Sequence, residues 1–290
     1  MKIIDTTTFY KENLMMELRM NILSKFVDYF VICESKYSHS GKKKKLYFDI
    51  NKFKDFKKEI IYLVCENEPE DLNSSKGFVP YIERQNSIKR IAFQRNFIQS
   101  CFENFSNNDF ILYSDNDEIP NIKHQNFFED DNKIYIFKQK LFYYKLNLIL
   151  PSVDWYGTKG CTIKNLKNIN WLRNIKNKKY SYLRIDTLFS KDRYQNIKII
   201  DNGGWHFSNL KTIEDLNDKY LNDENHADYS NLMSIENIQH DVTNWQIGVD
   251  HTKDKRSGSK LSKVNLVKED ISALPEFIVN NKNNYVDWIV

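Results

Sequence analysis

The segment from Asp115 to Pro120, DNDEIP, contains the most distinctive chemical groups of the chain, and it directly follows the apolar run 110–113. Side chains at positions i and i+2 of an extended chain point to the same side, so Asp115 and Asp117 could offer two carboxylates to one hard cation. Mg²⁺ or Mn²⁺ bound in this way keeps coordination positions open for phosphate oxygens. The alternative is an acidic turn in which Asp and Asn serve the turn geometry and Pro120 ends the strand.

A second candidate is Arg95, which lies on the apolar face of the helical pattern 87–105. An unpaired buried charge is costly, so its guanidinium must meet a carboxylate or a bound anion. We expect either a structural ion pair with Glu34 or Glu17, or a contact with a nucleotide or its diphosphate.

The third candidate is the segment 203–208, GGWHFS. Its paired glycines permit a close backbone approach or a positive φ. Alternation along a strand would let Trp205 pack on one face and turn His206 toward the cleft that contains Asp117. A lone histidine is more often a packing residue than a ligand. Two weaker polar clusters are the run Lys42 to Lys45, which is typical of a solvated loop, and the group Glu224, His226 and Asp228.

The elements that must position these residues can be predicted from hydrophobic periodicity. Strands are predicted at 2–4, 29–33, 60–64 and 110–113, near Thr162 and at 197–200, and helices at 14–27, 87–105 and 213–221. Short apolar runs between amphipathic helices are typical of an α/β fold with a mostly parallel central sheet that helices cover on both faces. Ligands bind at the carboxyl ends of the strands in such sheets. Glu34 and Ser35 directly follow the predicted strand at 29–33 and therefore lie at this edge. The aromatic stretch 133–150 is β-like and suits a wall for an acceptor.

Composition sets further limits. The chain has 290 residues, and 43 Lys and Arg against 39 Asp and Glu give a net charge of only +4, too little for a nucleic-acid partner. The 4 cysteines lie far apart and are expected to be reduced thiols. No apolar run approaches the roughly 20 residues of a spanning helix, so we expect a cytoplasmic protein without a transmembrane segment, with peripheral membrane contact left open.

Several segments, in order along the chain, resemble glycosyltransferase family 17, the β-1,4-mannosyl-glycoprotein β-1,4-N-acetylglucosaminyltransferase family. The matching segments are FYKENLMMELRMNIL from Phe9, VDYFVICESKYSHSGKKKKLYF from Val27, QRNF at 94–97, DNDEIP, GCT at 160–162, GGWHFS, GVDH at 248–251 and LPEFIVNNKNNYV from Leu274. An ordered set over nearly the whole chain is more specific than one D-x-D motif. We expect a single domain with a nucleotide-binding half at about 1–130, an acceptor half at about 131–250 and a tail at about 251–290.

The resemblance implies a GT-A type fold, a UDP-N-acetylglucosamine donor, a glycan acceptor and an inverting transfer assisted by Mn²⁺ or Mg²⁺. Carried over by position, the implied metal ligands are Asp115, Asp117 and His206. The implied donor-binding residues are Glu12, Glu34, Ser35, Arg95 and Asp115. For the base that deprotonates the acceptor hydroxyl, Glu214 is the first candidate, because it matches an acidic position of the family, and Asp154 beside Trp155 is the second.

Two alternatives from other classes stay open. A non-catalytic carbohydrate-binding module with a degenerate site would keep aromatic platforms but need not bind a metal, so manganese-dependent nucleotide binding separates it from an enzyme. A sugar nucleotidyltransferase also uses strand-end carboxylates and a metal, but it would release pyrophosphate in place of UDP.

Overall fold

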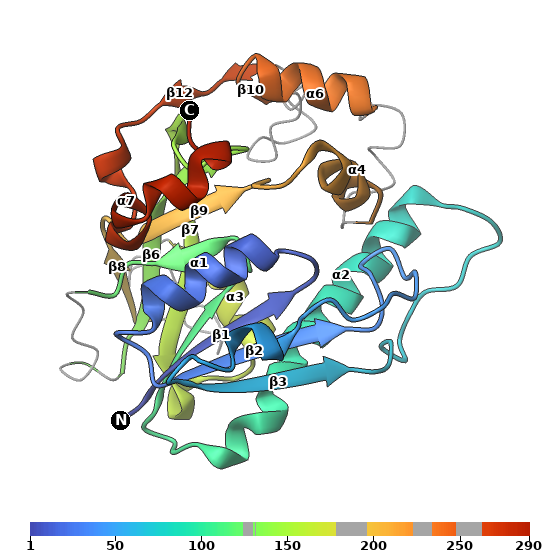
Figure 1. Ribbon diagram of the computed structural model, residues 1–290. Helices are drawn as coiled ribbons and strands as arrows, with labels where there is room; N and C mark the ends of the chain where they lie inside the picture. The colour runs from blue at the N-terminus through green and yellow to red at the C-terminus, as the bar shows by residue number, and fades with distance from the viewer. Residues whose placement is uncertain (124–129, 131, 178–195, 223–233, 248–262) are drawn as a thin grey trace, which may run out of the picture.

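The computed structural model describes residues 1–123, 130, 132–177, 196–222, 234–247 and 263–290. Strands and helices alternate in the first part of the chain, as the colour ramp of Figure 1 shows. Its elements are β1 Ile3–Phe9, α1 Asn13–Leu23, β2 Tyr29–Ser35, the 3₁₀ helix η1 Ile50–Phe53, β3 Glu59–Cys65, α2 Pro80–Phe97, the 3₁₀ helix η2 Ile98–Asn104 and β4 Phe110–Ser114.

The second part begins with the short strand β5 Glu118–Pro120. It continues with β6 Ile134–Tyr143, β7 Leu148–Thr162, η3 Ile163–Asn165, α3 Ile169–Asn174, β8 Ile197–Ile200, β9 Gly204–Ser208 and α4 Ile213–Asn222. The last described elements are α6 Ile235–Thr243, β10 Gln246–Ile247, β11 Val264–Asn265, β12 Val267–Lys268, η7 Ile271–Ala273, α7 Glu276–Asn280 and η8 Lys282–Trp288.

One sheet connects the two parts, with the strand order β3-β2-β1-β4-β7-β6-β9-β5, while β8 pairs with β6 and β12 pairs with β7. The strands β3, β2, β1 and β4 are parallel, as the sequence predicts. The long strand β7 runs antiparallel to both β4 and β6, so the sheet is mixed rather than mostly parallel beyond β4. The predicted aromatic wall at 133–150 becomes β6 and the start of β7.

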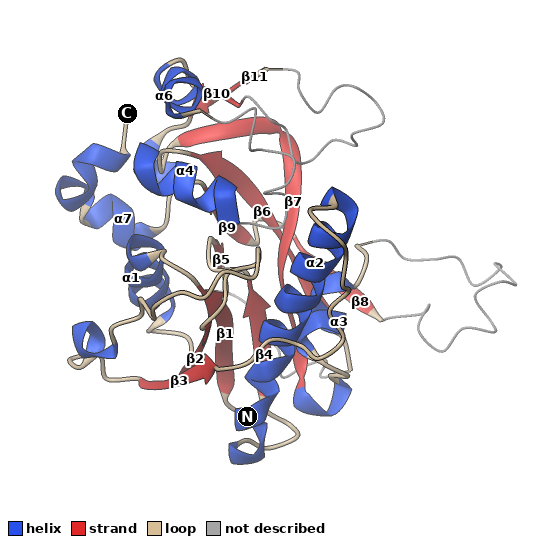
Figure 2. Ribbon diagram, turned by 90° about the vertical axis from the view of Figure 1, so that its right-hand side faces the viewer, coloured by secondary structure: helices blue, strands red, loops and turns tan. Residues whose placement is uncertain are grey.

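Helices cover both faces of the sheet, as Figure 2 shows, with α1 and α7 on one side and α2 and α3 on the other. Successive residues of a strand point to opposite faces of the sheet. Because residues 30–33 of β2 are all apolar and buried, both faces of this strand are apolar. Phe30 and Ile32 pack with α1 in one core cluster, whereas Val31 and Cys33 pack with α2 and α3 in another. All four cysteines are buried free thiols.

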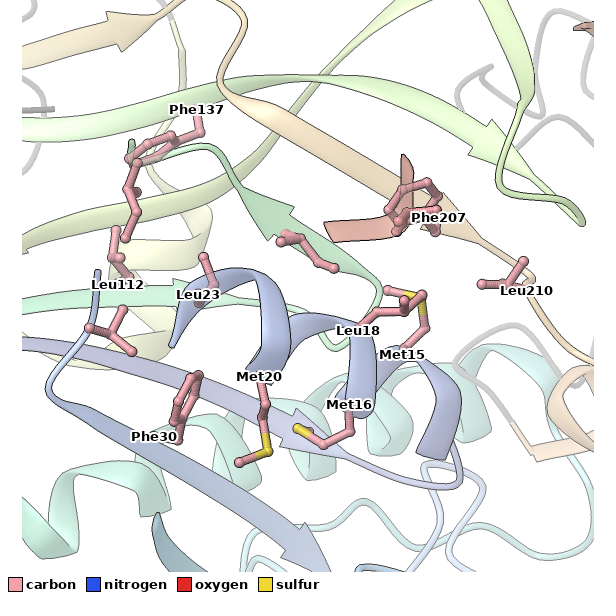
Figure 3. Close-up of a cluster of buried hydrophobic side chains, with 14 of the residues drawn as sticks. Met15, Met16, Leu18, Met20, Leu23, Phe30, Leu112, Phe137, Phe207 and Leu210 are labelled. Atoms are coloured by element: carbon pink, nitrogen blue, oxygen red, sulfur yellow. The ribbon is translucent and has the colours of Figure 1, made fainter. Parts of the chain in front are cut away.

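The helix α1 is buried on several sides, and its side chains lie between β2, β4 and β9 (Figure 3). It also carries Arg19, whose guanidinium is fully buried. Two of its nitrogens donate to the two carboxylate oxygens of Asp5 on β1, each at 2.6 Å, in a bidentate ion pair. The third nitrogen of this guanidinium, Nη1, donates to the main-chain oxygen of Glu118 at 2.5 Å. Because a buried guanidinium needs all of these acceptors, Arg19 ties α1 and β1 to the start of β5.

Several element boundaries differ from the sequence-based prediction; α1, for example, ends at Leu23 rather than at 27. β1 extends to Phe9, because the threonines after Ile4 are β-branched and occupy a central strand, where the hydroxyl of Thr6 donates to the main-chain oxygen of Leu112. The helix predicted at 87–105 begins earlier, at Pro80, a favoured first helical residue, and tightens into a 3₁₀ helix from Ile98.

Candidate active site

The DNDEIP segment forms the turn between β4 and β5, at 115–117, and β5 itself, at the carboxyl edge of the parallel strands. The amide of Glu118 donates to the main-chain oxygen of Asp115 at 3.1 Å, which closes the turn. The Glu118 carboxylate in turn accepts from the Asp115 amide at 3.2 Å. The acidic segment is therefore a turn by geometry, and it also presents its carboxylates at the sheet edge where ligands bind in α/β folds.

Asp115 lies between two arginines. Its carboxylate is 3.0 Å from Arg95 of α2 and 2.6 Å from Arg173 of α3, and it accepts from the Tyr113 hydroxyl at 2.9 Å. Burial opposes ionisation, but Arg173 and Arg95 outweigh it and hold the pKa of Asp115 well below its usual range. The expected partners of Arg95, Glu34 or Glu17, are thus wrong, because the guanidinium meets the strand-end aspartate instead.

Asp117 lies beside His206, as alternation along the GGWHFS strand predicts. The two strands β5 and β9 are antiparallel and pair Glu118 with His206, which leaves the imidazole Nε2 3.3 Å from the Asp117 carboxylate. Burial opposes ionisation of Asp117, but the neighbouring His206 outweighs it and lowers its pKa to about 2. The close strand approach depends on Gly204, where φ is +126° and a Cβ would lie 2.1 Å from the Ile119 oxygen.

The pair of Asp117 and His206 fits a divalent cation that takes its other ligands from a substrate. One carboxylate oxygen and one imidazole nitrogen are suitable donors, and adjacent ligands of an octahedral cation lie roughly 3 Å apart, close to the observed 3.3 Å. Both oxygens of Asp115 face arginines, and its role as a third metal ligand stays a prediction. Within the described ranges no cluster of three or more His, Cys, Asp or Glu side chains could hold a metal.

A pocket of about 160 Å³ opens beside this turn. It is lined by Thr8, Tyr10, Glu12, His39, Ile91, Gln94, Arg95, Asp115, Asn116, Lys219 and Asn222. The lining combines two cations, Arg95 and Lys219, with two carboxylates that are themselves ion-paired, an aromatic ring and several hydrogen-bonding groups. Burial and the nearby Arg95 guanidinium lower the pKa of His39 to about 4, so this imidazole is neutral at pH 7.

The structure brings some of the predicted donor-binding residues to this pocket and not others. Glu12 lines it, with its carboxylate 2.7 Å from Lys211. Glu34 is fully buried elsewhere, where it accepts from the Lys44 ammonium at 2.6 Å and from the amide of Tyr47 at 2.9 Å. Ser35 accepts from an amide two residues on. Glu34 and Ser35 thus fix the loop after β2, and their contact with a donor stays a prediction.

The basic run also differs from expectation. Lys44, one of its four lysines, is only 7% exposed and pairs with Glu34, so this loop is anchored to the core rather than wholly solvated. The cluster of Glu224, His226 and Asp228 lies outside the described residues.

The two candidate bases do not line the pocket. Asp154 on β7 is 59% exposed and 2.8 Å from Lys138. Its neighbour Trp155 points to the opposite face, toward Glu118, so Asp154 faces away from the DNDEIP turn. Glu214 is exposed in the first turn of α4, although the same helix brings Lys219 and Asn222 to the pocket wall. Their catalytic role stays a prediction.

Sequence reasoning missed Arg173 and the structural role of Glu118. The Glu118 carboxylate is fully buried and accepts from Arg173 at 2.8 Å and from the Trp155 indole at 2.7 Å. Lys159 on β7 holds the end of α3 by donating to the main-chain oxygens of Arg173 and, at 2.6 Å, Ile175. Its place inside DNDEIP was the sequence feature that could have pointed to Glu118. Arg173 lies on the short helix α3, whose sequence contains no motif that would have indicated a role in the site.

The chain was compared with curated proteins, with solved structures and with protein-family profiles. No curated protein matches the chain. Among solved structures, HddC from Yersinia pseudotuberculosis is 11% identical, with a TM-score of 0.37 over 70% of this chain and 92% of that one. The inositol-1-phosphate CTP transferase from T. maritima is 14% identical, with a TM-score of 0.35 over 82% of this chain and 96% of that one.

In the described part of the chain no helix combines the length and the apolar character needed to cross a membrane. The sequence profile of glycosyltransferase family 17 matches residues 1–288, nearly the whole chain and all of the segments that form the site. The chain therefore belongs to glycosyltransferase family 17 and is a transferase that uses a sugar donor and an acceptor.

Proposed function

We propose that this enzyme has a GT-A type fold and moves N-acetylglucosamine, or a related sugar, from a UDP-sugar to a hydroxyl group of a glycan. The transfer inverts the anomeric carbon and uses Mn²⁺ or Mg²⁺. The observation that carries this proposal is the arrangement at the carboxyl edge of β4. There Asp117 and His206 form a donor pair for a cation, beside a pocket that contains Arg95 and Lys219.

The donor would lie in the pocket of about 160 Å³. Arg95 and Lys219 supply positive charge for the diphosphate, and Tyr10 offers a ring for the base. Asp117 and His206 would hold the cation, which when bound neutralises charge on the departing diphosphate. Asp115 keeps Arg95 and Arg173 in place, so it acts on the donor through the arginines.

The reaction forms a bond from the acceptor oxygen to the anomeric carbon as the bond from that carbon to the diphosphate oxygen breaks. UDP leaves, and the hydroxyl proton passes to a carboxylate. Glu214 is the base to test first, because α4 also supplies two pocket residues. Asp154 is the second candidate, although its ion pair with Lys138 points it away from the turn.

The deciding experiment incubates the protein with a panel of UDP-sugars, Mn²⁺ and neutral glycan acceptors, and it measures the released nucleotide and the anomeric configuration of the product. We expect UDP release and a product of inverted configuration with UDP-N-acetylglucosamine, and loss of turnover in the Asp117→Asn variant. Release of pyrophosphate from a nucleoside triphosphate and a sugar phosphate would indicate a nucleotidyltransferase. Sugar binding without turnover of any donor would indicate a non-catalytic module.

A further inference from the structure

A second pocket, of about 280 Å³, lies between the C-terminal end of α1, the end of β5 and α7. Its lining includes three aromatic residues, Phe26, Trp205 and Phe277, and three asparagines, Asn21, Asn280 and Asn281. Trp205 and His206 are consecutive on β9 and point to opposite faces, so this pocket and the Asp117 site lie on opposite faces of the β5 and β9 pair. The function proposed above does not use it.

Aromatic rings form one part of its lining. Trp205 is fixed in place, because its indole N–H donates to the main-chain oxygen of Ala273 at 2.8 Å. Phe26 and Phe277 are half-buried at the same pocket. Rings held in this way offer an apolar surface that needs no reordering when a ligand binds.

Side-chain amides form the other part. The NH₂ groups of Asn21 and Asn281 donate to main-chain oxygens of their own helices, at 2.9 Å and 2.8 Å. An amide anchored through one N–H keeps an oxygen acceptor and a second N–H donor for a ligand. Asn280 is exposed at the rim. The pocket therefore combines apolar ring surface with paired donors and acceptors.

Charge is confined to the rim. Lys25, Lys123 and Glu276 are exposed, and the last two lie 3.3 Å apart, where they compensate one another. A ligand for this pocket should stack on aromatic rings, form hydrogen bonds with several amides and carry no net charge. A sugar ring meets these requirements, because its C–H faces are apolar and its hydroxyls both donate and accept hydrogen bonds. The volume is near the lower end of ligand pockets, roughly 300 Å³, which suits one sugar unit.

We propose that this pocket is a second carbohydrate-binding site, which holds one neutral sugar unit of a glycan at a distance from the point of transfer. That the sugar belongs to the acceptor rests on the function proposed above, whereas the sugar chemistry rests on the lining alone. The site would add contacts to a glycan without touching the donor.

The test measures sugar binding in the absence of donor and metal, so its outcome is separable from that of the transfer assay. Saturation-transfer NMR and calorimetry would use the Asp117→Asn protein with N-acetylglucosamine, mannose, galactose and chitotriose. We expect at least one of these sugars to bind in the millimolar range. Phe277→Leu, which keeps apolar bulk without the ring, and Asn280→Ala should each weaken that binding by about three- to tenfold.

The matched control is Asn283→Ala, which removes an exposed asparagine of the same terminal segment that does not line the pocket. It should bind the sugar as the parent does, and all three variants should keep the parent's melting temperature within a few degrees. The proposal is overturned if none of the four sugars binds at about 20 mM. It is equally overturned if binding persists unchanged in both pocket variants.

Discussion

At the scale of single residues, the two aspartates of the D-x-D motif have different partners. Asp115 is held by Arg95 and Arg173, whereas Asp117 has one imidazole beside it. A carboxylate between two guanidiniums is a poor ligand for a further cation, because binding the cation would break existing ion pairs. Asp117 is thus the member of the motif that we expect to bind a metal, together with its neighbour His206.

Replacing Asp117 by Asn removes a charge and a hard ligand while keeping the shape of the side chain. We expect metal-dependent affinity for UDP to fall about tenfold or more, with little change in melting temperature. Calorimetry with and without Mn²⁺ measures this directly. Asp154→Asn is the matched control, since that carboxylate faces away from the turn and should leave UDP affinity unchanged.

His39 predicts a specific pH dependence of stability. Its pKa is lowered to about 4 in the folded protein by burial and Arg95, against about 6.5 in the unfolded chain. Between these values the unfolded chain binds a proton that the folded one does not, so the free energy of unfolding falls as the pH falls through this window. His39→Gln should flatten that slope by up to about 1.4 kcal/mol per pH unit in urea titrations. An NMR titration that places the His39 pKa near 6.5 would contradict the prediction.

At the scale of elements, the short helix α3 supplies an arginine that holds two carboxylates. Arg173 is 12% exposed and contacts both Asp115 and the fully buried Glu118. Arg173→Met would leave these charges without their shared partner, and we expect a loss of about 3–5 kcal/mol in the free energy of unfolding. Urea denaturation measures the loss. Adding Glu118→Gln to this variant should recover part of it, and full additivity of the two losses would argue against a shared ion pair.

The pairing of β5 with β9 depends on Gly204, because an added Cβ would lie 2.1 Å from the Ile119 oxygen. Gly204→Ala should separate the strands, destabilise the protein and move His206 from Asp117, which would weaken metal-dependent UDP binding. Gly77→Ala is the matched control: φ is +83° there, but no atom lies within 4 Å of the added Cβ. Its cost should be limited to backbone strain, about 1 kcal/mol. Equal losses in both variants would show that strain alone is responsible.

At the scale of the whole molecule, one sheet and a shared core cluster join the predicted halves. β4 of the first half pairs with β7 of the second, and a single buried cluster contains both Phe9 and Phe207. We therefore expect one cooperative unfolding transition, with coincident urea curves from tryptophan fluorescence and far-UV circular dichroism. Two separated transitions would show that the halves are independent domains.

The features of this protein that depend on local pattern could be predicted from its sequence. The parallel strands β1 to β4, the helix α4 and the place of DNDEIP after a buried strand follow from hydrophobic periodicity. The orientation of His206 toward Asp117 follows from alternation along one strand. These features could be predicted because apolar runs and the alternation along a strand are local patterns, although the pairing of β5 with β9 that completes the contact of His206 with Asp117 is not local.

Which charged side chains form ion pairs depends on the folded structure and could not be predicted from the sequence. Arg95 pairs with Asp115 rather than Glu34, and Arg173 reaches the same carboxylate from a helix that motif reasoning did not single out. Glu34 instead anchors the loop after β2 through Lys44. A buried charge must find a counter-charge, but its identity is set by the register of α2 and α3 on the sheet. That register depends on the packing of the whole core, so no local pattern in the sequence encodes it.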